Sequence, residues 1–128
     1  MKKLLLLLAL IIITSCSTSD DDKTVEKNYF NPPVWIQGTW KEPKTGATFT
    51  FTRDNVICNL NKTEINFKKN ATDVKDLGGH INVQETINDN LYSANFEYGD
   101  RSLLISFTKN SNTEIESTTY LPGVFTKQ

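Results

Sequence analysis

Few side chains in this chain could carry out catalytic chemistry. The sequence has one histidine, His80, and two cysteines, Cys16 and Cys58. A nucleophilic serine or cysteine needs a base beside it, and a metal site usually needs two or more clustered His or Cys ligands. A single histidine supplies neither arrangement, and the acidic residues are scattered along the chain. We therefore predict that the protein is not an enzyme and has no metal and no cofactor.

The alternation of apolar and polar residues assigns opposite faces to Cys58 and His80. Cys58 shares its phase with Val56 and Leu60, so we expect a buried, unreactive thiol. His80 is out of phase with the inward-facing Ile81, so we expect it to face water.

Three polar side chains fall on inward positions of predicted strands. Glu85 shares the phase of Ile81 and Val83, and a buried carboxylate there could fix the polar end of a ligand. The alternative, which we favour, is a β-bulge that turns Glu85 out to water. Tyr92 and Tyr98 also have the inward phase. Glu85, Tyr92 and Tyr98 are therefore the candidate ligand-contacting residues.

The N-terminus has the pattern of a targeting segment. Two lysines precede an apolar run over residues 4–13, which is too short to span a bilayer because spanning needs about 20 residues. Residues 13–16, Ile-Thr-Ser-Cys, resemble the lipobox of bacterial lipoproteins. The resemblance implies a signal peptide over residues 1–15, diacylglycerol and palmitate on Cys16, and stable anchoring to a membrane through two or three acyl chains.

A polar, acidic stretch follows the cysteine. We expect residues 16–33 to form an unfolded tether that ends at two prolines. Ser19, Asp20, Asp21 and Asp22 resemble the export signal of Bacteroidetes lipoproteins, which implies the outer membrane and display on the cell surface. The alternative is a spacer whose charges only keep the domain off the bilayer.

The charge of the mature chain does not favour a nucleic acid partner. Loss of residues 1–15 leaves 12 basic and 15 acidic residues, a formal charge of −3, and from Lys23 onward the two signs balance at 12 each. A balanced domain has no electrostatic attraction to nucleic acid. With Cys16 acylated, Cys58 has no partner for an intramolecular disulfide.

From Val34 to Gln128 the sequence predicts an all-β domain. Threonine and phenylalanine alternate over residues 48–52, and similar alternation recurs between short turn signals such as Asn61-Lys62. The spacing predicts eight or nine antiparallel strands in a meander, either closed into a small barrel or folded as a two-sheet sandwich. Residues 69–79 interrupt the pattern; we expect a polar loop with one helical turn, capped by Thr72 and ended by Gly78.

The residues from Trp35 to Lys41, which include Gly38-Thr39-Trp40, followed by the alternating strand at 46–51, are similar to the small lipocalin-like lipoproteins of Bacteroidetes. In lipocalins the tryptophan plugs the closed end of the barrel, and an arginine of the final strand stacks on it. The resemblance implies the plug role for Trp40, while the final strand here carries Lys127.

Two kinds of non-enzymatic function remain open. The protein is expected to be a binding or interaction module, either a carrier of a small apolar ligand inside the barrel or an envelope protein that acts as an inhibitor or immunity-type partner. The inward aromatic residues are numerous enough to fill a small barrel. We therefore expect a mostly filled interior, with any pocket at the mouth away from Trp40 and near residues 69–79.

Overall fold

A computed structural model describes residues 28–128, and it confirms an all-β fold with nine antiparallel strands and one short α-helix. The prediction of a meander is confirmed, because each strand pairs with the next one along the chain, except that β4 and β5 do not pair. An additional pair, β1 with β9, joins the two halves of the chain into one sheet. The elements are the 3₁₀-helix η1 (Val34–Ile36), β1 (Gly38–Lys41), β2 (Thr48–Phe51), β3 (Val56–Leu60), β4 (Thr63–Asn66), α1 (Phe67–Asp76), β5 (Ile81–Ile87), β6 (Leu91–Tyr98), β7 (Arg101–Lys109), β8 (Glu114–Ser117) and β9 (Gly123–Lys127).

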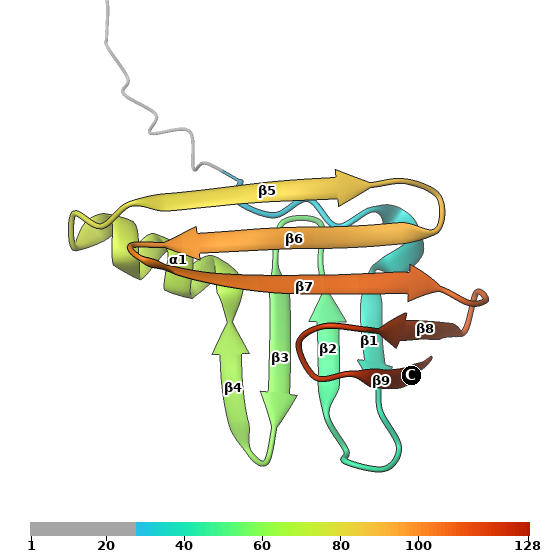
Figure 1. The fold of residues 1–128 in the computed structure, drawn as a ribbon. Helices are drawn as coiled ribbons and strands as arrows, with labels where there is room; N and C mark the ends of the chain where they lie inside the picture. The colour runs from blue at the N-terminus through green and yellow to red at the C-terminus, as the bar shows by residue number, and fades with distance from the viewer. Residues whose placement is uncertain (1–27) are drawn as a thin grey trace, which may run out of the picture.

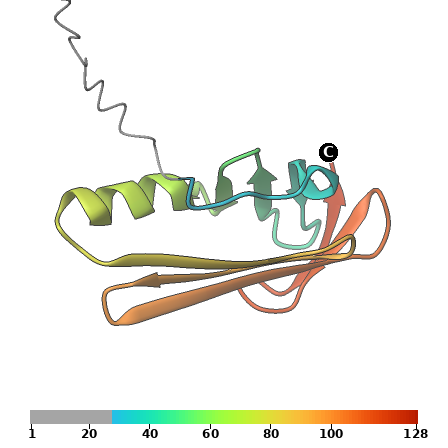
Figure 2. The same ribbon diagram turned by 90° about the horizontal axis from the view of Figure 1, so that it is seen from above.

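The nine strands form one sheet that curls into a half-barrel. The order is β4-β3-β2-β1-β9-β8-β7-β6-β5, so β4 and β5 are its two edges and do not pair with each other. Figure 1 shows β1–β4 running across the direction of β5–β7, and Figure 2 shows these two groups as facing layers. The segment between the edges forms α1, which lies in the layer of β1–β4 and occupies the place where further strand pairing would close a barrel.

The alternation over residues 48–51 gives the predicted faces. Phe49 and Phe51 are 0% and 2% exposed, whereas Thr48 and Thr50 are half-buried. Cys58 of β3 pairs with Phe49 and is also buried, as predicted. Side chains of both layers fill the space inside the curl. The largest fully buried ones are Phe30, Trp40, Phe49, Phe51, Phe67, Tyr92, Phe107 and Phe125.

The packed part of the chain begins before the predicted boundary at Val34. Tyr29 and Phe30 are buried in the core, and the Phe30 ring lies 6.1 Å from that of Phe67 between centroids. The prediction that the tether extends to Pro33 is therefore wrong for residues 29–33. Two prolines prevent regular structure there, but an extended segment can still bury its aromatic side chains.

The helix α1 is longer than the predicted single turn, and its cap is a different residue. Asn66, not Thr72, caps it, since the Asn66 side chain accepts a hydrogen bond from Lys69 N at 3.0 Å. Gly78 follows the last turn with φ = 80°, as predicted for the end of a helix. The helix is stable here because Phe67 and Ala71, one turn apart, are both buried against the sheet.

Candidate functional site

A pocket of about 500 Å³ lies between α1 and the sheet, and we call it the helix-side pocket. This volume is within the range of about 300–1,000 Å³ that is typical of sites for small molecules. Its walls come from β4, α1, β6, β7 and the loop between β8 and β9. The lining residues are Ile65, Phe67, Asn70, Asp73, Val74, Phe96, Tyr98, Leu103 and Tyr120.

Strands β6 and β7 form the sheet wall of this pocket through a short run of inward positions. Phe96 pairs directly with Leu103, and Tyr98 lies two residues further along the same face of β6. The Phe96 and Tyr98 rings stack with centroids 5.1 Å apart. The sheet therefore presents a continuous apolar surface, with one tyrosine at its outer end.

The loop between β8 and β9 contributes Tyr120 to the lining, with its ring 6.5 Å from that of Phe67 between centroids. The buried Ser117 hydroxyl donates to the Tyr120 carbonyl at 2.9 Å, and Leu121 has a left-handed backbone with φ = 51°. A left-handed leucine is strained, so the surrounding structure must hold this turn in place. Burial, with a smaller contribution from Cys58, raises the pKa of Tyr120. Its hydroxyl therefore stays neutral and available for hydrogen bonding.

The helix contributes the polar part of the lining. Asn70 and Asp73 lie three residues apart, hence on one side of α1, together with Val74. Asp73 Oδ2 accepts a hydrogen bond from Lys69 Nζ, four residues earlier on the helix. Both partners of this ion pair are more than half exposed, so the pair contributes little to stability.

Of the predicted ligand-contacting residues, Tyr98 lines the helix-side pocket, whereas Glu85 and Tyr92 do not. The Glu85 carboxylate accepts hydrogen bonds from Tyr92 Oη at 2.8 Å, from Asn31 N at 2.7 Å and from Asn31 Nδ2 at 3.0 Å. The predicted bulge is wrong, because the pairing of β5 with β6 is unbroken and Glu85 pairs with Ala94. The Glu85 carboxylate is therefore hydrogen-bonded to Asn31 and Tyr92, the contacts that the sequence analysis assigned to a ligand.

Trp40 is fully buried in β1. Its Nε1 donates to the Ile36 carbonyl at 2.7 Å, and Lys127 Nζ lies 5.2 Å from its ring centroid. A lysine of the final strand thus occupies the position that the resemblance to lipocalins assigns to an arginine. The helix-side pocket does not include Trp40, and the plug role of Trp40 stays a prediction.

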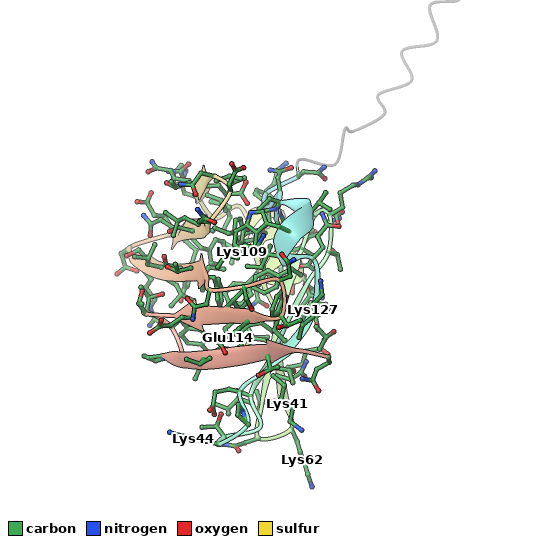
Figure 3. The ribbon with its side chains drawn as sticks, turned by 90° about the vertical axis from the view of Figure 1, so that its right-hand side faces the viewer. Lys41, Lys44, Lys62, Lys109, Glu114 and Lys127 are labelled. Carbon is green, nitrogen blue, oxygen red and sulfur yellow. The ribbon has the colours of Figure 1, made fainter. Side chains whose placement is uncertain are left out.

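Figure 3 views the molecule from the end that lies away from α1. The labelled Lys41, Lys109, Glu114 and Lys127 belong to β1, β7, β8 and β9, whereas Lys44 and Lys62 lie on the turns that follow β1 and β3. None of these lysines lines the helix-side pocket.

His80 and Cys58 have the predicted exposures. His80 is exposed, and Cys58 is 1% exposed. Among residues 28–128, no three His, Cys, Asp or Glu side chains gather as a metal site, and no helix is long and apolar enough to cross a bilayer. The candidate lipidation and export residues Cys16, Ser19, Asp20, Asp21 and Asp22 lie outside the described residues.

Burial raises the pKa of the Cys58 thiol to about 11, against about 8.5 for a cysteine in an unfolded chain. Above the lower value the folded state holds more protons than the unfolded state, so this contribution to stability is lost as pH rises between the two values. We expect the free energy of unfolding to fall less steeply from about pH 8 to about pH 10.5 in Cys58→Ala than in the native chain. Urea unfolding at each pH measures the two slopes, and equal slopes would contradict the prediction.

Sequence reasoning expected any pocket near residues 69–79, but of the nine residues that line the helix-side pocket it named only Tyr98 as a ligand contact. Phe67, Asn70 and Val74 have the spacing of one helix face, a signal that the expectation of a polar loop concealed. Tyr120 lies in a loop, and no periodicity in the sequence indicates which way its ring points.

The structure is that of an antiparallel β protein with a largely apolar pocket between its helix and its sheet. No family model matches the chain, and no curated protein or solved structure does either.

Proposed function

We propose that this protein is a membrane-anchored binding module that holds a small, largely apolar molecule in the helix-side pocket. The observation that carries the proposal is the pocket itself. Seven of its nine lining residues are aliphatic or aromatic, and a few polar groups stand at its helix side. Sites for small molecules typically combine an apolar lining with few polar groups. This is the carrier function that a lipocalin-like domain implies, with the guest beside the filled core.

The sheet wall offers a matched pair of variants to test the pocket. Leu103 lines it, whereas the adjacent Leu104 points to the other face of β7 and is 45% exposed. We expect Leu103→Trp to fill the pocket and weaken binding of a neutral apolar probe, N-phenyl-1-naphthylamine, by about tenfold or more. Leu104→Trp should leave binding unchanged. The measurement is a titration that follows the fluorescence of the directly excited probe.

The outcomes of this titration are distinct. Loss of binding only in Leu103→Trp supports the pocket as the binding site. No saturable binding by the native chain, or equal loss in both variants, would contradict the proposal. Circular dichroism spectra of the two variants check that each one folds.

The proposed location rests on the N-terminal sequence. The apolar run and the residues Ile-Thr-Ser before Cys16 support acylation of that cysteine, and the three aspartates at 20–22 support display on the cell surface. A tethered domain there would meet small molecules outside the cell.

We expect Cys16→Ser to abolish incorporation of radiolabelled palmitate and to leave an uncleaved precursor. The acyl chains supply the anchor, because each buried methylene contributes about 0.8 kcal/mol. The native chain should be digested when protease is added to whole cells. Equal palmitate incorporation by native and variant chains would exclude acylation of Cys16, and full protection from protease would exclude surface display.

A further inference from the structure

The side chains that line the helix-side pocket include one charged group, and its charge is negative. Asp73 is the charged residue among the nine that line it, and the other polar groups are the Asn70 amide and the hydroxyls of Tyr98 and Tyr120. Among residues 28–128, no lysine, arginine or histidine lines the pocket. A guest with an anionic head would therefore find Asp73 and no lining cation.

The aromatic part of the lining is suited to a cation. The rings of Tyr98, Phe96, Phe67 and Tyr120 form a chain in which neighbouring centroids lie 5.1, 6.3 and 6.5 Å apart. A cation is attracted to the face of such rings when it lies within about 6 Å of the centroid. In the part of the chain that the structure describes, the lysines held over rings are Lys109 and Lys127, each over a tryptophan elsewhere. Within residues 28–128, no lysine is held over the rings of the pocket.

Asp73 is available to an incoming cation. Its partner Lys69 does not line the pocket, and both side chains of the ion pair are largely exposed. An exposed pair of this kind is weak, so a cationic guest can compete with Lys69 for the carboxylate. Removal of Lys69 should then favour the guest.

We propose that the helix-side pocket selects amphipathic cations, molecules with an amine or quaternary ammonium head and an apolar body, over neutral and anionic amphiphiles of the same size. The apolar body packs against Ile65, Val74 and Leu103. The head lies between the tyrosine rings and Asp73. This inference rests on the proposed function, since it names the class of molecule that the pocket binds.

The test compares three probes with the same ten-carbon chain: decyltrimethylammonium, decanol and decanoate. Isothermal titration calorimetry on the purified chain is expected to show the tightest binding for the ammonium, at least about fivefold tighter than decanoate. If none of the three binds, the proposed function fails. If decanol or decanoate binds as tightly as the ammonium, the pocket is a binding site but the inference about charge is overturned.

Helix variants with matched charge changes sharpen this test. Asp73→Asn should weaken ammonium binding by about twofold to fivefold and leave decanol binding unchanged. Asp76→Asn removes the same charge from the same helix at a residue outside the pocket lining and should have no effect on either probe. Lys69→Met should tighten ammonium binding. Equal effects of the two aspartate variants, or weaker ammonium binding in Lys69→Met, would overturn the role of Asp73.

Discussion

Phe49→Ala is expected to lower the free energy of unfolding by about 3 to 5 kcal/mol, which is the range for removal of a buried phenylalanine. Phe49 is fully buried, and its ring lies 4.8 Å from that of Phe107 and 5.3 Å from that of Phe125. The substitution leaves a cavity between the two layers, which the surrounding strands cannot close completely. Domains of this kind have a total stability of about 5 to 15 kcal/mol, so the loss is a large fraction of it.

Thr48→Ala is the matched control for Phe49→Ala, because Thr48 is the adjacent residue of β2 and points to the other face. It should cost less than about 1 kcal/mol. Urea unfolding followed by tryptophan fluorescence measures both values. Similar losses in the two variants would mean that the inside of the curl is not the core.

Glu85→Ala is expected to cost about 2 to 3 kcal/mol, since it removes the acceptor of three hydrogen bonds. One of the donors is the hydroxyl of Tyr92, a residue that is 0% exposed, and its hydroxyl would be left without a partner. The other two donors belong to Asn31, so the variant also releases the segment that precedes η1. Gln84→Ala, at an exposed neighbouring position of β5, should change stability by less than about 0.5 kcal/mol.

A double-mutant cycle separates the two parts of the Glu85 effect. Burial, followed by the Glu85 carboxylate, raises the pKa of Tyr92, so the hydroxyl is a neutral donor to that carboxylate. If the orphaned hydroxyl accounts for much of the loss, Glu85→Ala combined with Tyr92→Phe should cost less than the sum of the two single variants. Strict additivity would show that Tyr92 and Glu85 do not interact energetically.

The strands were predictable from the sequence because their signals are local. Alternation of threonine with phenylalanine fixes the faces of β2. Asn61 and Lys62, both with positive φ, form the two-residue turn between β3 and β4 that the sequence indicates. The inward phase of Glu85 is equally local. The expected bulge is absent, because Asn31 and Tyr92 donate hydrogen bonds to the carboxylate and the pairing of β5 with β6 is unbroken.

The features that sequence did not predict depend on contacts between distant segments. Tyr29 and Phe30 are buried through contacts with residues far along the chain, such as Phe96. The two prolines that follow them indicated an unfolded segment instead. The helix begins at Phe67, which is two residues after Ile65 and so continues the alternation of a strand. The sequence therefore does not show where the strand period changes to the helix period. The two edge strands, β4 and β5, do not pair, and the chain between them forms α1 instead of a short hairpin turn.

The early start of the packed domain also sets how far it can move from a membrane. If Cys16 carries the acyl chains, the connection to Tyr29 consists of residues 17–28, or twelve residues. Fully extended, these residues span at most about 40 Å. A tether that ended at Pro33 would reach about 60 Å. An acylated chain would therefore hold the packed domain on a tether about 20 Å shorter than the proline boundary implies.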